Sequence, residues 1–393
     1  MKNITRSVWV LSIVSLFTDM ASEMLYPVLP IYLQTIGFSI LLIGILEGIA
    51  EATSGLSKGY FGQLSDSKAK RSPFVQIGYA FSAISKPMMA FFVYPLWILF
   101  ARTLDRFGKG IRTGARDALL SDEATPATKG EVFGFHRSMD TLGAVLGPLF
   151  ALIYLFYYPE DYINLFYIAF IPGALAVIST FFLKDKKRLA APTKKKIGFF
   201  SFIDYWKKSP SEYKITARGL LFFALFNSSD VFLLLKAKEA GFDDTMVIGM
   251  YIFYNLVYAA FAFPLGRLAD KLGLKRMFLF GLILFSLVYF GMAAFTSTYA
   301  FIVLFFGYGL YAAATEGITK AWLSNLVSKE NTATAIGTFS AFQSICAMIA
   351  STLAGLLWYQ FGADTSFLLT AIATVFVILY FTIKKPDLNK GFK

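Results

Sequence analysis

The feature that most constrains this chain is a succession of long apolar stretches separated by short polar connections. A helix needs about 20 apolar residues to cross the roughly 30 Å hydrocarbon core of a bilayer, and only helices and closed barrels satisfy their backbone hydrogen bonds there. Stretches of this length favour helices over a barrel. The sequence predicts twelve, at 7–34, 39–61, 73–93, 95–120, 131–157, 162–184, 215–238, 244–264, 274–297, 299–327, 332–360 and 365–384.

Composition excludes several classes of protein. With 56% hydrophobic and 16% charged residues, the chain is too apolar for an ordinary soluble surface. The formal charge of +12 does not indicate a nucleic-acid partner, because most Lys and Arg lie in short connections or near helix ends. A single cysteine, Cys346, permits neither a disulfide framework nor a cysteine-rich metal site. We expect a multi-pass protein of a bacterial or archaeal cytoplasmic (inner) membrane, without metal or cofactor.

A basic segment at 184–214 divides the chain almost equally. Basic loops stay in the cytoplasm, so we place this segment, the loops at 68–71 and 271–276 and both termini there. Only the connection near Lys236 and Lys238 departs from this pattern. The predicted organisation is an N-terminal six-helix bundle at 1–184, a basic cytoplasmic linker at 185–214 and a C-terminal six-helix bundle with a short tail at 215–393.

Two similar polar segments follow the second and eighth predicted helices, at the same spacing from a preceding Gly-Phe pair in each half. The first, here called the N-motif, contains Gly62, Asp66, Lys70 and Arg71. The second, the C-motif, contains Gly266, Asp270, Gly273, Lys275 and Arg276. The glycines permit close helix approach, and the aspartates can meet a helix N-terminus or an arginine. The alternative for either copy alone is a tight cytoplasmic turn with basic residues. Two copies in register indicate a parallel repeat of six helices.

These motifs resemble the loop signature of the major facilitator superfamily, and the C-motif matches it more completely. Tyr26-Pro27-Val-Leu-Pro30 is similar to the helix-one signature of that family. The helix-five motif of its drug/proton antiporters resembles the segment containing Gly143, Gly147 and Pro148. The resemblance implies twelve helices in two six-helix bundles, alternating access and, through the helix-five motif, export. The alternative for that motif is plain helix packing, since small residues four apart and proline kinks are common in membranes.

Carboxylates lie within the first two predicted helices. Asp19 and Glu23, and likewise Glu47 and Glu51, are four residues apart and share a helical face. Charged groups at such depth are costly, so they are candidates for proton coupling or for lining a substrate cavity. The alternative is charge compensation by the cation-rich fourth helix. Two of its cations, Arg102 and Arg106, are themselves candidates for proton coupling or for the substrate cavity. Arg106 lies in a segment that loosely resembles the helix-four motif of the family.

The remaining candidates are scattered. Asp140 lies one turn beyond the only histidine, His136. The second half supplies fewer charges, and its candidates are Asn227, Asp230, Asn255, Glu316 and Gln343. We expect Glu316 to pair with Lys320. This distribution predicts that proton or cation handling lies in the N-terminal half, while aromatic and amide groups of the C-terminal half shape the substrate site.

The functional hypothesis is a secondary transporter that exports a small organic compound in exchange for protons. No phosphate-binding loop or nucleophile motif is present, so an ATPase or another enzyme is disfavoured. The expected partners are the bilayer and a small-molecule substrate, and the expected state is a monomer. Three alternatives stay open: an uptake permease, a cation or metal-complex transporter using the carboxylates of the first two helices, and a receptor that does not transport.

Overall fold

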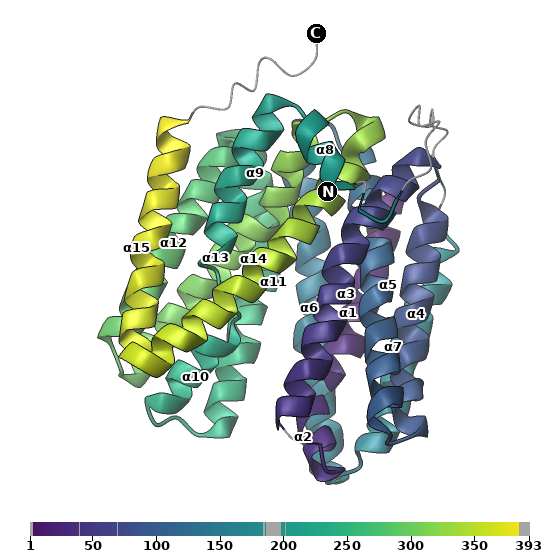
Figure 1. The fold of residues 1–393 in the computed structure, drawn as a ribbon, viewed down its shortest axis with the longest axis vertical. Coiled ribbons are helices and arrows are strands. Elements are labelled where there is room, and N and C mark those ends of the chain that lie inside the picture. The colour runs from purple at the N-terminus through teal and green to yellow at the C-terminus, as the bar shows by residue number, and fades with distance from the viewer. Residues whose placement is uncertain are drawn as a thin grey trace. The chain divides into compact units, whose positions relative to one another are not determined.

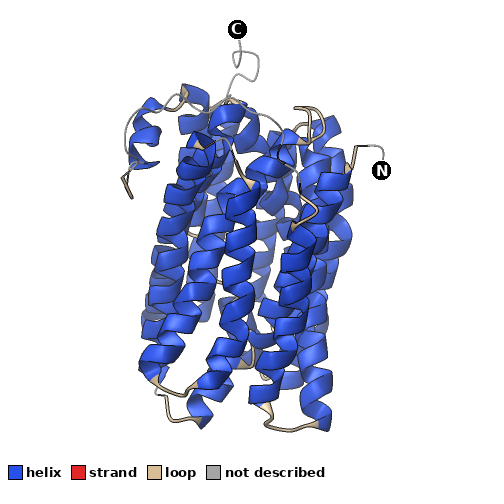
Figure 2. Cartoon of the chain, turned by 90° about the vertical axis from the view of Figure 1, so that its right-hand side faces the viewer, coloured by secondary structure: helices blue, strands red, loops and turns tan. Residues whose placement is uncertain are grey.

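The computed structural model describes residues 3–38, 40–68, 70–183, 185, 198–200 and 202–384. Most of the basic linker and the tail beyond residue 384 lie outside the described residues, as does the side chain of Glu47. Within the described part, the chain forms helices and no strand (Figure 2). The fold is therefore all-α, as the sequence predicts.

The helices follow the predicted apolar stretches closely. In the N-terminal half they are α1 (Arg6–Leu25), α2 (Leu29–Thr35), α3 (Ile40–Ser67), α4 (Ser72–Phe91), α5 (Pro95–Asp122), α6 (Lys129–Tyr157) and α7 (Tyr162–Thr180). The linker contains α8 (Phe202–Lys208). The C-terminal half contains α9 (Ser211–Ala224), α10 (Val231–Glu239), α11 (Asp244–Leu272), α12 (Leu274–Ala294), α13 (Thr298–Asn325), the 3-10 turn η1 (Lys329–Asn331), α14 (Thr332–Phe361) and α15 (Ala363–Ile383).

The predicted first and seventh spans are each interrupted. The first divides into α1 and α2 around Pro27, whose missing N–H and ring disfavour a continuous helix. The seventh divides into α9 and α10, which are separated by residues 225–230. Broken helices at membrane depth occur in transporters, where the irregular backbone is buried in protein or lines a cavity.

Two predicted helix ends are wrong in a way that matters for the motifs. We expected Gly62 and Asp66, and likewise Gly266 and Asp270, to lie in loops, but α3 continues to Ser67 and α11 to Leu272. The apolar stretch marks where a helix leaves the hydrocarbon, whereas the helix itself ends only where its backbone hydrogen bonding stops. Gly273, with φ of +99°, ends α11 in a conformation that favours glycine.

Among the described residues, eight helices are individually long and apolar enough to cross a membrane: α1, α6, α7, α11, α12, α13, α14 with η1, and α15. The other predicted spans correspond to α3, α4, α5 and the α9–α10 pair. Buried serines, lysine and arginine interrupt the apolar character of α3, α4 and α5. The span formed by α9 and α10 is interrupted by the helix break.

The chain divides into two units. Unit 1 comprises Met1–Ala124, Met139–Lys208 and Ser328–Ala341. Unit 2 comprises Thr125–Ser138, Ser209–Val327 and Phe342–Lys393. The first turns of α6 therefore belong to unit 2, and those of α14 belong to unit 1.

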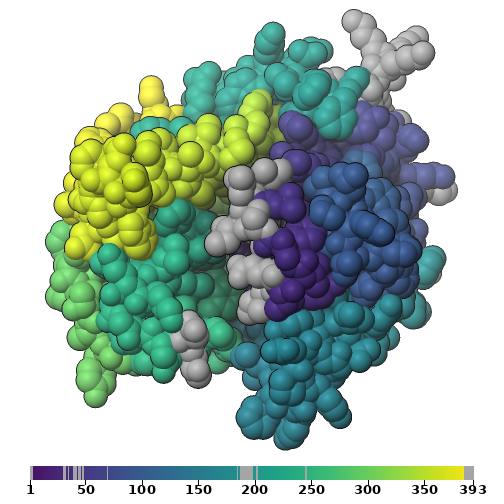
Figure 3. Space-filling view, turned by 60° about the horizontal axis from the view of Figure 1, so that its bottom comes forward, coloured from purple at the N-terminus to yellow at the C-terminus, as the bar shows by residue number. Residues whose placement is uncertain are grey.

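Helices at matching positions of the two repeats pack in the same pairs. In unit 1, α3 packs on α5, α4 on α5 and α7, and α1 on α7 (Figure 1). In unit 2, α11 packs on α13, α12 on α13 and α15, and α9 on α15. The later part of α14 lies beside α15, as the yellow-green and yellow surfaces of Figure 3 show. The Ser366 hydroxyl of α15 donates there to the carbonyl oxygen of Ala354 on α14 at 3.3 Å. The shared packing confirms the parallel repeat.

Candidate functional site

A pair of carboxyl groups lies where α1 meets α6 in unit 1. The carboxyls of Asp19 and Asp140 are close enough to share a hydrogen bond. Ser15, one turn before Asp19, donates its hydroxyl to Asp140 Oδ1. Arg116 Nη1 donates in turn to Ser15 Oγ at 3.3 Å. Asp140 is buried, while Asp19 is half-buried and has Glu23 and Lys109 within electrostatic range.

The helix-five motif explains why this pair can form. A Cβ atom at Gly143 would collide with the carbonyl oxygen of Leu16, and one at Gly147 would lie 2.5 Å from the carbonyl oxygen of Met20. The two glycines therefore let the backbone of α6 press against α1 over one full turn. Asp140 lies one turn before Gly143 on the same face, so this close packing sets it beside Asp19.

The acids of the first two predicted helices do not all gather at one point. Arg106 Nε lies 3.6 Å from Glu51 Oε2, so this carboxylate belongs to an ion pair. Glu23 lies near Asp19, and the side chain of Glu47 is outside the described part. Among the described side chains, no group of three metal-ligating residues is close enough to hold an ion.

A second polar network in unit 1 was missed by sequence reasoning. Lys86 Nζ of α4 donates to Asp105 Oδ1 of α5 at 2.8 Å, and Arg102 Nη1 lies 3.4 Å from Asp105 Oδ2. All three side chains are buried. Arg102, predicted as a site candidate, therefore serves here as a partner of Asp105. A lysine inside the apolar stretch 73–93 was the signal that pointed to such a pair.

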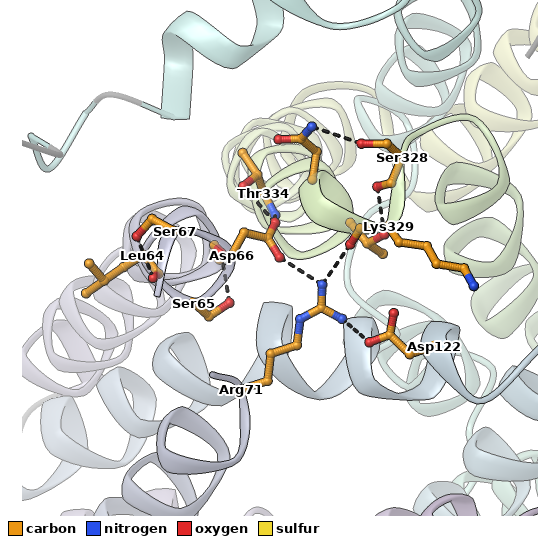
Figure 4. A network of polar contacts seen from close by, with 12 residues as sticks. Leu64, Ser65, Asp66, Ser67, Arg71, Asp122, Ser328, Lys329 and Thr334 are labelled. Atoms are coloured by element: carbon orange, nitrogen blue, oxygen red, sulfur yellow. Dashed lines mark hydrogen bonds and ion pairs between the residues drawn. The ribbon is translucent and has the colours of Figure 1, made fainter. Parts of the chain in front are cut away.

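The N-motif forms a buried polar network in unit 1 (Figure 4). Asp66 Oδ2 accepts from the backbone nitrogen of Thr334 at 2.7 Å and from its hydroxyl at 2.9 Å. Thr334 lies in the first turn of α14, where helix N–H groups lack intrahelical partners and the helix dipole is positive. Arg71 Nη2 donates to Asp66 Oδ1 at 2.9 Å and to the Lys329 carbonyl oxygen at 3.0 Å, while Nη1 donates to Asp122.

The C-motif makes the corresponding contact in unit 2. Asp270 accepts from the backbone nitrogens of Gly130 and Glu131, each at 2.7 Å, in the first turn of α6. Arg267 Nη2 donates to the Glu131 carboxylate at 2.7 Å rather than to Asp270. Each motif aspartate thus binds the N-terminus of a helix that continues into the other unit.

The motif glycines make these contacts possible. A Cβ at Gly62 would collide with the carbonyl oxygen of Ala333, and one at Gly266 would collide with that of Gly130. Of the motif cations, Lys70 and Arg276 are exposed, and Lys275 Nζ donates to the Lys384 carbonyl oxygen at 3.1 Å.

The linker adds contacts that the sequence did not suggest. Asp185 accepts from the backbone nitrogens of Arg71 and Ser72, at 3.2 Å each, at the start of α4. The Phe202 ring of α8 packs on Gly59 of α3. Burial, and then the nearby charge of Asp66, raises the pKa of the Tyr205 phenol. The linker helix therefore lies close to the N-motif.

In unit 2 the candidates fall into two groups. Asp230, at the end of the break between α9 and α10, accepts from the Tyr254 hydroxyl at 2.6 Å and the Tyr308 hydroxyl at 2.7 Å. Asn227 Nδ2 donates to Tyr311 Oη at 3.1 Å. These residues lie together, because α11 and α13 pack side by side.

The other unit 2 candidates lie elsewhere. Asn255 Nδ2 donates to the Tyr251 carbonyl oxygen of its own helix at 3.0 Å, and Gln343 is half-buried on α14. Glu316 Oε2 lies 3.4 Å from Arg137 Nη2 on α6. Pairing of Glu316 with Lys320 stays a prediction.

Two repeats of membrane helices, with a helix-capping aspartate at the same place in each, define a polytopic protein with a transporter fold. The profile of the Major Facilitator Superfamily matches residues 11–253 and 216–392. An uncharacterised MFS-type transporter of Methanocaldococcus jannaschii is 34% identical over 380 residues, which cover 95% of this chain and 94% of that protein. The chain belongs to the major facilitator superfamily and is a membrane transporter, not an enzyme.

Further comparisons agree on the fold. The human organic anion transporter TETRAN superposes with a TM-score of 0.81 at 17% identity, covering 95% of this chain and 98% of that one. The Escherichia coli fucose:proton symporter FucP gives 0.77 at 12% identity, covering 95% and 97%. A multi-drug resistance efflux pump PmrA homologue of Lactococcus lactis is 21% identical over 374 residues, covering 91% of this chain and 90% of that protein.

Proposed function

We propose that this transporter exports a small organic compound in exchange for protons, as in the drug/proton antiporter branch of the family. The observation that carries the proposal is the Asp19–Asp140 carboxyl pair. Two carboxyls that share a hydrogen bond hold a single proton between them, because two negative charges at that distance repel strongly. A site that gains and loses one proton is what coupling to a pH gradient requires.

Other acids of unit 1 belong to ion pairs. Glu51 lies against Arg106, and Asp105 against Lys86 and Arg102, so those carboxylates already have cationic partners. Asp140 accepts from the Ser15 hydroxyl, whose oxygen accepts in turn from Arg116 Nη1. Asp19 and Asp140 are therefore the proposed coupling residues, with Glu23 beside them.

The motif aspartates supply a mechanism for alternating access. Asp66 and Asp270 each bind the first turn of a helix, and these contacts are proposed to hold one conformation and to break in the other. The motifs, the basic linker and both termini are proposed to face the cytoplasm, because basic connections favour that side. The direction of export rests on the helix-five motif, together with the efflux-pump homologue among the relatives.

The test is compound-induced proton movement in reconstituted vesicles. Inside-acidic proteoliposomes report their pH gradient by quenching of an acridine dye, and ethidium or the neutral compound chloramphenicol is then added. Wild-type protein should dissipate the gradient with at least one of the two compounds. Asp19→Asn and Asp140→Asn should not, whereas the control Asp161→Asn, in an exposed loop where Asp161 accepts from Tyr154, should behave as wild type. Dissipation by both coupling variants at the wild-type rate would refute the proposal.

A further inference from the structure

The break between α9 and α10 presents a carboxylate that does not cap its own helix. Asp230 occupies the N-cap position of α10, where an aspartate normally accepts from the N–H groups of the first turn. Here its side chain makes no such bond and turns instead to tyrosines of α11 and α13. The α9 helix of 14 residues places the break roughly 20 Å from the start of that span. This depth is near the middle of a bilayer.

Among the described residues, the charge of Asp230 has no cationic counterpart. Within the part of the chain that the structure describes, its carboxylate is bonded by the hydroxyls of Tyr254 at 2.6 Å and Tyr308 at 2.7 Å, both neutral donors. Asp66 and Asp105 of unit 1 are buried carboxylates that differ from it, because each contacts an arginine or lysine. A carboxylate at membrane depth is costly without a positive partner. Asp230 is half-buried, so a ligand can reach it.

A row of aromatic rings lies beside this carboxylate. The ring centroids of Tyr254 and Tyr308 lie 5.3 Å apart, and those of Tyr308 and Tyr311 lie 5.4 Å apart. Tyr251 continues the row at 5.4 Å from Tyr254. The faces of aromatic rings are electron-rich and attract cations, and such cages recognise organic ammonium groups. Hydroxyl bonds to Asp230 keep two of these rings in place.

A hydrogen-bond acceptor nearby is unused. Asn227 Nδ2 donates to Tyr311 Oη, while its Oδ1 is buried without a hydrogen-bond partner. Leaving a buried acceptor unpaired costs free energy, so such an atom indicates an absent donor. A carboxylate and an amide oxygen together offer acceptors and negative charge. A protonated amine offers the complementary donors and positive charge.

We infer that Asp230, Asn227 and the tyrosines of α11 and α13 form the substrate headgroup site, and that this site binds the ammonium group of an organic amine. This assignment rests on the proposed function and names the substrate class for it. The residues of this site all belong to unit 2, whereas the carboxyl pair belongs to unit 1. Proton coupling and substrate recognition thus use different residues.

The test measures binding to the purified full-length protein at one pH, with no gradient. Equilibrium dialysis compares phenylethylammonium with its neutral analogue 2-phenylethanol and its anionic analogue phenylacetate. Wild-type protein should bind the ammonium at least tenfold more tightly than either analogue. Asp230→Asn should weaken ammonium binding at least tenfold, and Tyr254→Phe or Tyr308→Phe about threefold, because each removes one bond that orients the carboxylate.

Two controls keep the result decisive. Asp364→Asn removes an exposed unit 2 carboxylate that pairs with Lys236 at 2.6 Å, and it should bind the ammonium as wild type does. Asp230→Glu keeps the charge and should retain more affinity than Asp230→Asn, which separates loss of binding from loss of folding. Wild-type affinity in Asp230→Asn, or no preference for the ammonium over its analogues, would overturn the inference.

The two proposals fail separately. If the protein shows no preference for the amine but chloramphenicol still drives proton movement, the proposed amine site is wrong and the coupling proposal stands. Amine binding that depends on Asp230, without proton movement in vesicles, would remove the coupling and leave the site.

Discussion

The two units share a helix arrangement but not its chemistry. In unit 1, buried acids meet cations or each other, as in the Lys86–Asp105 pair and the Asp19–Asp140 pair. In unit 2, the half-buried acid Asp230 meets tyrosine hydroxyls. The difference teaches that one scaffold, repeated, holds two kinds of polar interior, because helix packing depends on small residues at a few positions and leaves the others free to diverge.

We expect the largest effect, a loss of stability, when an ion pair of unit 1 is removed. Lys86→Met leaves the buried Asp105 carboxylate with the longer Arg102 contact of 3.4 Å. Breaking a buried ion pair by removing one partner costs about 3–5 kcal/mol, so we expect a large fall in thermal stability of the purified protein. The double variant Lys86→Met/Asp105→Leu should recover most of it. A double variant as unstable as the single one would show that the pair is not what stabilises α4 on α5.

The next largest effect concerns coupling and sharpens the contrast within unit 1. Asp19→Asn and Asp140→Asn should keep substrate exchange between loaded vesicles but lose gradient-driven accumulation by at least tenfold. Glu51→Gln should still accumulate substrate, because that carboxylate is paired with Arg106 at 3.6 Å. Counterflow and gradient-driven flux in the same proteoliposomes measure both quantities. Accumulation by all three variants would assign these acids a structural role.

The two motif aspartates offer a direct comparison between repeats. Asp66→Asn removes the negative charge from the bonds to Thr334 and Arg71, and Asp270→Asn removes it from the bonds to two backbone nitrogens; each change also replaces one acceptor oxygen by an NH2 donor. Hydrogen bonds to charged groups contribute about 1.5–3 kcal/mol each. We expect roughly tenfold slower flux for Asp66→Asn and a smaller loss for Asp270→Asn, with expression retained in both. Normal flux in the double variant would end the proposal that these contacts hold a transport state.

The smallest effect is expected at the rim of the C-motif. Arg267 pairs with Glu131 at 2.7 Å; the Arg267 side chain is 46% exposed and that of Glu131 6%, so solvent reaches the pair from the arginine side and screens it in part. Arg267→Met should therefore change flux less than twofold and leave the melting temperature nearly unchanged. A loss of flux as large as that of Asp270→Asn would mean that Arg267 helps Asp270 to hold the same conformation.

Sequence reasoning predicted what depends on local pattern. Apolar length gave the spans, and two motif copies in register indicated the repeat that the packing confirms. The spacing of Gly143 and Gly147 suggested close packing, yet it did not reveal that the facing helix is α1. The partners of Asp230 were out of reach for the same reason: Tyr254 and Tyr308 lie 24 and 78 positions away, and only the packing of α11 on α13 brings them together.

The ends of helices were predicted least well, for a physical reason. Hydropathy reports where a helix leaves lipid, so it ended the second predicted span at 61, while backbone hydrogen bonds carry α3 to Ser67. Proline was the better local signal, since Pro27 stands where α1 gives way to α2. The break at 225–230 contains no proline, and it was marked only by a run of polar residues ending at Asp230.

The assignment of α14's first turns to unit 1 has a consequence for synthesis. Asp66 and Thr334 are separated by 268 positions, and Arg71 and Lys329 by 258. The ribosome therefore makes one partner of each bond long before the other exists, and unit 1 stays incomplete until most of the second repeat has been translated. Severing the gene between the repeats would yield fragments that each lack a piece of their own bundle. Such fragments should assemble only when both are expressed together in one cell.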